Sequence, residues 1–460
     1  MTKYIIIIFC LVFFFILPAS NKKIIPIDLL TGLPAEDFYI VLTEDIFEPF
    51  IGLSNYFLNF YNIKLQLKSW LLWLLLINIF IGILKNKKII NIFKSIFFTF
   101  IFFYLFLVYT IYFNSSFPYK VISKNSDLFL LDIHSHTLYS HDGLSTLKDS
   151  YNWHLKSGFD GYFITDHNNN LGVANSREIF SKGFGLRIFF GEEIQDKNGV
   201  NLLILGLSKT VSKYMNNETE KIVDIVHKDN GIVIAAHIWH KKRDRLEELS
   251  NTNIDGFEIY GRASTPLDKN FQLKIINFCK KNNLIMLAGS NRHGWSMVNN
   301  LWTGVYIPGW QKLDNETLQK MIINYISKKQ QDKFRVFVLE KKEKFTELRY
   351  IFEPFIGLFY YFSNLTAKQF LTWVLWITIA IVFIEKYRMI SIKQKNILKL
   401  LAYLLIAFLF FFNAILFFIR WCNYRIYNKI LFTSSELFFI SGLIFISLCI
   451  IKARDLYFKR

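Results

Sequence analysis

The sequence contains few of the residues that crosslink small secreted proteins or build cysteine metal sites. Its 460 residues include four Cys, and no two of them form a C-x-x-C pair. Cys10 and Cys449 lie in apolar runs, Cys422 lies beside one, and Cys279 stands alone in a polar region. A disulfide framework and a cysteine-based zinc site are therefore excluded.

Acidic residues are also scarce, with 36 Asp and Glu against 54 Lys and Arg and a formal net charge of +18. Such an excess could attract nucleic acid. However, residues 124–345 hold 30 Lys and Arg against 25 Asp and Glu, and the rest of the chain holds 24 against 11. Most of the excess therefore lies beside apolar segments, where basic residues set membrane topology. We expect the bilayer as a partner and no stable nucleic-acid partner.

Long apolar runs are abundant, and hydrophobic residues make up 52% of the chain. Residues 1–20 are typical of a signal peptide or a short anchor helix. Five further runs approach the ~20 residues that a bilayer requires. They cover residues 69–84, 94–113, 368–385, 397–419 and 431–451. We predict a multi-pass integral membrane protein with about six spans, of the kind found in a bacterial inner membrane.

Lys and Arg gather in two short loops and at the C-terminus, in residues 85–94, 386–395 and 452–460. If these segments are cytoplasmic, residues 114–367 face outward, on the periplasmic side. Arg420, Arg425 and Lys429 oppose this orientation, because their loop would also face outward.

One eight-residue segment occurs twice: residues 46–53 and 351–358 both have the sequence IFEPFIGL. A Tyr-Phe pair, a W-x-x-W pair and at least two apolar runs follow each copy. Both copies have the same direction, so we predict a duplicated parallel membrane repeat. The duplication either only packs helices or brings Glu48 and Glu353 into a lipid or substrate site.

These features divide the chain into a polar central domain and flanking membrane parts. The expected parts are residues 1–20 (signal or anchor), 21–68 (outer segment with the first repeat), 69–113 (two spans), 121–345 (central domain), 346–367 (second repeat), 368–451 (three spans) and 452–460 (cytoplasmic tail).

All nine His lie between His134 and His293. Several of them follow short apolar runs, and two further runs are followed by Glu instead. The six runs cover residues 128–133, 161–165, 186–190, 231–236, 254–257 and 284–288. Helical patterns separate many of these runs, which favours a parallel sheet. Polar residues at the carboxyl ends of successive strands are the layout of a barrel active site. His134 and His136, two residues apart, are expected to point to one face and share a metal ion.

Six segments in this region occur in the order and approximate spacing found in one enzyme family: D-I-H-S-H-T, I-T-D-H-N, G-E-E-I, A-A-H, F-E-I-Y and G-S-N-R-H. Over residues 127–310 the sequence resembles the PHP family, the polymerase and histidinol phosphatase domains. The resemblance implies an α/β fold, a distorted (β/α)7 PHP barrel flanked by transmembrane helices. It also implies two or three divalent metal ions, Zn, Mn or Fe, that hydrolyse phosphate esters.

The resemblance also implies roles for individual residues. His134 and His136 would bind the first metal, and Glu193 would bridge it to a second metal bound by His237. Glu193 is preferred to its neighbour Glu192, because the family's glutamate follows Gly by two positions. The expected ligands of a third metal are Asp142, His167 and His293.

Two positions depart from the family's pattern. Asn291 stands where the family usually has an Asp, and an Asn oxygen would coordinate without charge. A His is usual shortly after the bridging glutamate, but Asn201 lies near that place. His141, as an alternative to Asp142, or His240 could supply a replacement ligand. The alternative to catalysis is a degenerate domain that only binds.

The remaining polar residues give weaker expectations. Arg292 is expected to pair with a substrate phosphate, and Asp166 is expected to support His167 rather than bind metal. His154 and His227 are interpreted as surface or packing residues. The substrate is expected to be a phosphorylated small molecule, an oligonucleotide or a lipid, attacked by metal-activated water.

Overall fold

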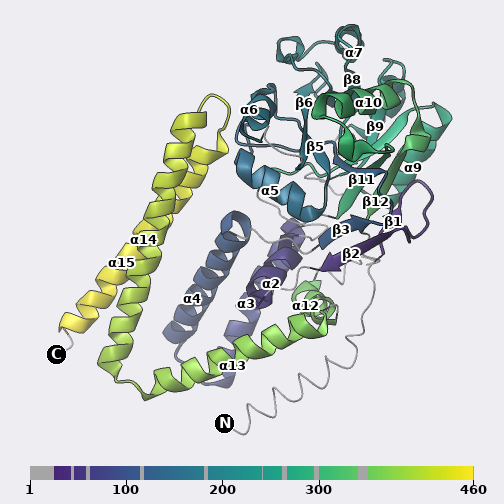
Figure 1. The fold of residues 1–460 in the computed structure, drawn as a ribbon. Coiled ribbons are helices and arrows are strands. Elements are labelled where there is room, and N and C mark those ends of the chain that lie inside the picture. The colour runs from purple at the N-terminus through teal and green to yellow at the C-terminus, as the bar shows by residue number, and fades with distance from the viewer. Residues whose placement is uncertain are drawn as a thin grey trace.

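The computed structural model describes most of the chain. The described residues are 25–42, 46–58, 63–113, 119–180, 185–240, 242–261, 267–294, 300–339, 351–363 and 365–458. The expected signal or anchor segment lies outside them. Figure 1 shows an α/β domain beside a set of long helices.

A ten-stranded sheet forms the frame of the α/β domain, in the order β1-β12-β11-β4-β5-β6-β7-β8-β9-β10. Its strands are β1 (Ile27–Asp28), β4 (Leu128–Asp132), β5 (Gly161–Ile164), β6 (Arg187–Gln195), β7 (Asn201–Leu205), β8 (Ile232–Ala235), β9 (Gly256–Gly261), β10 (Ile285–Gly289), β11 (Leu301–Tyr306) and β12 (Phe334–Val338). A separate antiparallel pair joins β2 (Phe38–Leu42) to β3 (Tyr119–Ser123).

The sheet is mixed, so the expected (β/α)7 pattern is met only in part. Two blocks are parallel, β4-β5-β6 and β8-β9-β10. β7 runs antiparallel to both of its neighbours, and so does β11. β6 extends beyond the expected end at residue 190, and β7 returns along it as a hairpin. β1, which precedes the long apolar helices in the chain, also pairs with β12. No pattern in the sequence predicted this pairing.

The sheet curves until its two parallel blocks approach each other. Thr303 of β11 donates its hydroxyl to Ala288 O of β10 at 2.9 Å, and Ala288 N donates to that hydroxyl at the same distance. Inward-facing side chains of β4, β5, β6, β7, β8, β10 and β11 form one buried cluster with α10. The result is a half-barrel whose interior is filled by side chains.

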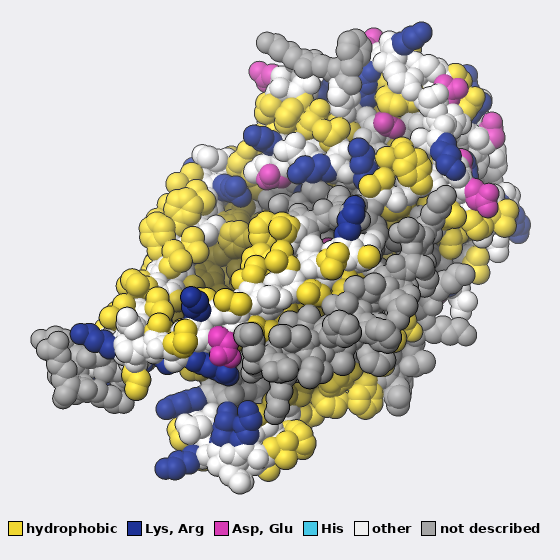
Figure 2. All heavy atoms as spheres, turned by 60° about the horizontal axis from the view of Figure 1, so that its bottom comes forward, with side chains coloured by type: hydrophobic (Ala, Val, Ile, Leu, Met, Phe, Trp, Pro, Cys, Tyr) yellow, Lys and Arg dark blue, Asp and Glu magenta, His cyan; other side chains and the backbone are white. Residues whose placement is uncertain are grey.

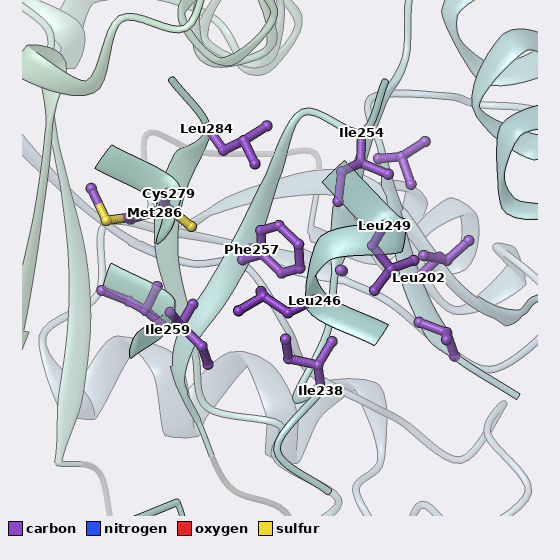
Figure 3. Close-up of a cluster of buried hydrophobic side chains, with 14 of the residues drawn as sticks. Leu202, Ile238, Leu246, Leu249, Ile254, Phe257, Ile259, Cys279, Leu284 and Met286 are labelled. Carbon is purple, nitrogen blue, oxygen red and sulfur yellow. The ribbon is translucent and has the colours of Figure 1, made fainter. Parts of the chain in front are cut away.

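Helices cover the outer face of this sheet. They are α5 (Leu147–Ser157), α6 (Leu171–Phe180), α7 (Thr219–Lys228), α8 (Leu246–Ser250) and α9 (Lys269–Lys281). α10 (Asn315–Ser327) instead packs against the inward-facing side chains. α5 shows why the sequence defines these ends: Thr146 and Asp149 form a capping box, and Gly158 closes the helix with φ +85°. Figure 3 shows the apolar cluster in which Phe257 and Met286 pack against residues of α8 and α9.

Five helices among the described residues are long and apolar enough to cross a membrane. They are α3 (Ile63–Leu84), α4 (Ile89–Val108, continued to Phe113), α13 (Ala367–Met389), α14 (Ile392–Tyr424) and α15 (Ile430–Phe458). They coincide with the five expected runs after the first. Their outer surfaces carry exposed side chains such as Phe80, Phe383 and Phe408, and Figure 2 shows hydrophobic side chains spread over this part of the molecule, with Lys and Arg side chains among them.

The two IFEPFIGL copies lie in α2 (Glu48–Leu58) and α12 (Glu353–Ser363), and each contacts the other half of the chain. Trp376 Nε1 donates to Ile46 O at 2.7 Å, and Trp73 Nε1 donates to Ile351 O at 2.6 Å.

The two glutamates of the repeat also form hydrogen bonds with the other half of the chain. Tyr361 donates to Glu48 at 2.9 Å, and Tyr56 donates to Glu353. Both glutamates are buried. These contacts favour the packing interpretation of the repeat, and a parallel relation between the complete halves stays a prediction.

Candidate metal centre

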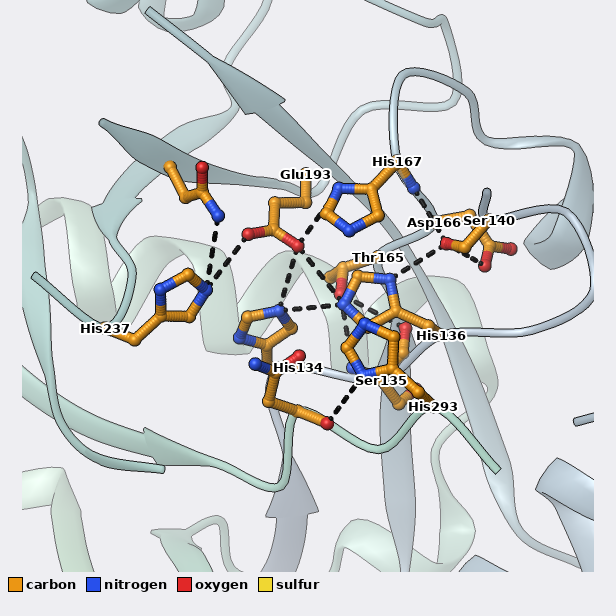
Figure 4. A network of polar contacts seen from close by, with 12 residues as sticks. His134, Ser135, His136, Ser140, Thr165, Asp166, His167, Glu193, His237 and His293 are labelled. Atoms are coloured by element: carbon orange, nitrogen blue, oxygen red, sulfur yellow. Dashed lines mark hydrogen bonds and ion pairs between the residues drawn. The ribbon is translucent and has the colours of Figure 1, made fainter. Parts of the chain in front are cut away.

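The candidate site lies at the ends of β4 and β6, where buried His and Glu side chains converge (Figure 4). His134 and His136 follow the last residue of β4, and Glu193 lies on β6. The two histidine Nε2 atoms are 3.0 Å apart. Glu193 Oε2 is 3.2 Å from His134 Nε2 and 3.1 Å from His136 Nε2. We call these three residues the inner half of the site, and all three are at most 1% exposed.

The contacts behind the two rings determine which ring nitrogen carries a proton. Ser140 Oγ donates to Asp166 Oδ1 at 3.0 Å, so it accepts from His136 Nδ1 at 2.9 Å. His134 Nδ1 faces Glu258 Oε1 at 3.4 Å, and an ionised carboxylate only accepts. Both rings therefore donate from Nδ1 and direct an Nε2 lone pair at the other ring and at Glu193. With both rings neutral, two lone pairs and a carboxylate oxygen would converge, so the site requires a positive charge among these atoms.

Electrostatics make the inner half attractive to a positive charge. Burial alone would lower the pKa of His134, but Glu193 and Glu258 overcome it and raise this pKa to about 10. Burial, with repulsion from two neighbouring imidazoles, lowers the pKa of His136 well below its usual value. A proton on His134 supplies the positive charge in the metal-free protein, and a divalent cation would replace it on binding.

His237 lies on the other side of Glu193, with its Nε2 3.2 Å from Glu193 Oε1. It follows β8 with φ +27°, a strained value for a residue other than Gly, and its N–H donates to Glu258 Oε2 at 2.8 Å. Glu193 therefore directs one oxygen to the inner half and the other to His237, which is the geometry of a bridging carboxylate. Asn201, noted above for the missing His, lies 3.3 Å from His237 Nε2.

The outer half consists of His141, Asp142, His167 and His293. Asp142 lies 3.1 Å from His293 Nε2 and 3.7 Å from His167 Nε2. His167 Nδ1 is also 3.4 Å from Glu193 Oε2, which joins the two halves. The side chains of Asp142 and His141 are 34% and 53% exposed, so the site opens to solvent here. The structure thus brings the expected Asp142, His167 and His293 together, with His141 beside Asp142.

The spacing of these donors fits divalent metal ions. Donors at ~2.0–2.2 Å from a tetrahedral ion lie about 3.3 Å from one another, close to the separations in the inner half. Among the residues that the structure describes, three groups bring ligand atoms within 4.8 Å: His134, His136 and Glu193; His136, His167 and His293; and His141, Asp142 and His167. Imidazole and carboxylate donors are suitable for divalent ions of this kind, so the residues fit a metal centre, and the number of ions stays a prediction.

Comparisons with known proteins add only distant likenesses. No protein-family model matches the chain, and no curated protein does. One similar solved structure is a two-domain protein from Bacteroides vulgatus containing a predicted PHP-like metal-dependent phosphoesterase (15% identity, TM-score 0.35, 49% of this chain and 69% of that one). Another is the lesion-specific endonuclease PfuEndoQ from Pyrococcus furiosus (14% identity, TM-score 0.34, 44% of this chain and 56% of that one). These similarities are too low to carry an argument, so the site's own geometry must carry the function.

Arg292 is the expected site residue whose side chain does not face the cluster. It alternates with Asn291 and His293 along one segment, and its guanidinium lies 4.9 Å above the Trp153 ring and donates to Ser145. Burial lowers its pKa to about 10. In this geometry Arg292 packs the segment against α5, and a phosphate contact through its guanidinium stays a prediction.

Asn291 contributes its backbone to the site: its N–H donates to His134 O at 2.8 Å, and its carbonyl lies 2.9 Å from His293 Nδ1. Its φ of +47° is in the left-handed region that Asn tolerates. Metal coordination by its side chain stays a prediction.

Three supporting residues were missed or only partly recognised from the sequence. Glu258 contacts both His134 and the His237 backbone, and its place at the end of an apolar run was the available signal. Asp132 accepts from His154 at 3.1 Å and from Ser290 N at 2.8 Å, so His154 is a buried packing residue. Asp166 accepts hydrogen bonds from Thr137 N and Ser140 Oγ, so it supports the loop that carries these residues.

Proposed function

We propose that the chain is a membrane-tethered metal-dependent phosphoesterase. The observation that carries this proposal is the convergence of His134 Nε2, His136 Nε2 and Glu193 Oε2 within 3.2 Å of one another. Buried acceptors arranged in this way are unfavourable unless a positive charge, either a proton on His134 or a bound cation, lies among them. When bound, divalent ions supply Lewis acidity, which lowers the pKa of water and neutralises phosphate oxygens.

The chain's own residues hold and orient this centre. His134, His136 and His237 would hold the ions through their Nε2 atoms, and Glu193 would hold them through its carboxylate. Glu258 and Ser140 fix the ring orientations through the Nδ1 atoms, a contact that strengthens histidine ligands. Asp142 lies on the side of the site that opens to solvent, where a phosphate would enter. Water attacks phosphorus, and the ester oxygen leaves with a proton.

The resemblance supports a nucleotide or oligonucleotide 5′-phosphate as substrate, whereas the membrane helices support a phosphorylated lipid or an envelope intermediate. The second candidate function is a binding domain without catalysis, which Asn291 and Asn201 favour because neither brings charge to the metals. We also propose that residues 114–367 face outward. A reporter inserted after Asn300 that matures only in the cytoplasm should stay inactive, and an active reporter would reverse this orientation.

The decisive experiment uses the full chain purified in detergent. Elemental analysis should find at least two equivalents of Zn, Mn or Fe per chain. The Mn²⁺-loaded protein should hydrolyse at least one member of a panel containing a generic phosphomonoester, a 5′-phosphorylated oligonucleotide and a phosphorylated lipid. Metal without turnover on any of these would support the binding function, and a metal-free chain that takes up no metal would exclude both.

A further inference from the structure

The turn between α14 and α15 reaches the loop that carries the outer half of the metal site. Asn428, in this turn, is fully buried. Its Nδ2 donates to Ser140 O at 2.8 Å, to Leu138 O at 3.2 Å and to Gly143 O. Figure 1 shows the end of this helical hairpin beside α5 and α6 of the α/β domain. One side-chain amide thus donates to three backbone carbonyls of a loop that is nearly 300 residues away in sequence.

Neighbouring contacts extend this attachment along the loop. Lys429 N donates to His141 O at 2.9 Å, and Tyr139 packs between Tyr424 and Tyr427, with ring centroids 5.1 and 5.5 Å away. Leu138 packs in the same buried cluster as residues of α4, α14 and α15. The loop is therefore held from outside by the membrane hairpin.

The same loop supports the metal ligands on its inner side. Ser140 accepts from His136 Nδ1 and also from His167 N at 3.0 Å, so its position orients both histidines. Asp142, two residues later, is the carboxylate of the outer half. Contacts within the α/β domain hold the loop as well: Asp166 accepts from Thr137 N and Ser140 Oγ, and Leu144 N donates to His293 O at 2.7 Å. Asp142 is partly exposed, and Gly143 makes a close turn in which a Cβ would lie 1.9 Å from Thr137 O.

We infer that the α14–α15 turn is part of the metal centre, and that Asn428 is a positioning residue for Ser140 and Asp142. This inference rests on the proposed function, because it presumes that the cluster binds metal. It means that the membrane hairpin completes the outer metal position, whereas the inner position depends mainly on the strands of the α/β domain and contacts the loop through Ser140.

The test compares metal binding by four full-length proteins in detergent, titrated with Mn²⁺ and Zn²⁺. The Asp142→Ala variant lacks the carboxylate of the outer half, so the metal binding that it loses identifies the equivalent bound there. Asn428→Ala should weaken binding of that same equivalent by about 10-fold or more. The inner equivalents should weaken by a smaller factor, since they contact the loop through Ser140 and His136, and their retained binding also shows that the variant is folded. Asn423→Ala, on the exposed surface of the same helix end, should bind metal as the wild type does.

A second variant covers the case in which Asn428→Ala does not fold. Tyr427→Leu removes the ring beside Tyr139 and keeps Asn428, and it should weaken the outer equivalent in the same direction by a smaller factor. Unchanged outer binding in the folded variants would overturn the inference and leave the phosphoesterase proposal intact. Absence of metal from the wild-type protein would remove both.

Discussion

The inner and outer halves of the metal site differ in what holds them. His134, His136 and Glu193 are buried and belong to β6 or to the residues directly after β4, so the sheet determines their positions. Asp142 belongs to a partly exposed loop that a distant helical turn holds by hydrogen bonds. We therefore expect the inner half to bind metal tightly in a preformed geometry, and the outer half to depend on the membrane part of the chain.

The largest effect should follow from removing the inner half. The His134→Ala/His136→Ala variant loses two of the three convergent donors, so it should lose the tightly bound metal and at least about 100-fold of phosphoesterase activity, more than an outer-sphere change costs. Elemental analysis and initial rates at saturating Mn²⁺ measure both. His227→Ala is the matched control, because His227 pairs with Asp255 outside the cluster. Full metal content in the double variant would show that the inner half is not a metal site.

The adjacent glutamates of β6 give a sharper comparison, because their side chains point to opposite faces of one strand. Burial opposes ionisation of Glu193, but His167 and His134 hold its pKa well below the usual range. Glu193→Gln keeps the shape and removes the charge, so metal affinity should fall by about 10- to 100-fold. Glu192→Gln should leave affinity unchanged, since Glu192 accepts from Thr210 and Val211 N. Equal losses in both variants would contradict a bridging role for Glu193.

Much of the inner half could be predicted from the sequence because it depends on local order. D-I-H-S-H-T at the end of an apolar run places His134 and His136 together, and in G-E-E-I the resemblance favours Glu193 over Glu192 by its distance from Gly191. The same local reasoning predicted five membrane-length helices close to their observed bounds.

What could not be predicted depends on contacts between distant segments. No local pattern indicates that Asn428 donates to a loop near Ser140, or that β1 joins the sheet beside β12. β7 was missed altogether, because residues 201–205 were not among the predicted runs, and an apolar run does not by itself give the direction of a strand. Sequence adjacency of Arg292 to His293 likewise does not give the direction of its side chain in an extended segment.

The mildest predicted change is a shift in pH without any substitution, and the two halves should respond to it differently. The pKa of His134 is raised to about 10, so the metal-free inner half carries a proton at neutral pH that a cation must displace. Affinity for the inner equivalent should therefore rise about tenfold per pH unit between pH 6.5 and 8.5, with release of one proton.

The outer half should respond less. Burial raises the pKa of Asp142, but His293 and its neighbours outweigh burial and hold it well below the usual range; burial lowers that of His167. Both donors are thus already deprotonated across this window, and the outer affinity should change by less than about threefold per unit. Calorimetric titrations of wild-type protein and Asp142→Ala, in buffers of different ionisation enthalpy, count the protons released by each equivalent. The positive charge of the metal-free site resides on His134. If the inner equivalent of metal binds without proton release, Glu193 and Glu258 do not raise the pKa of that ring.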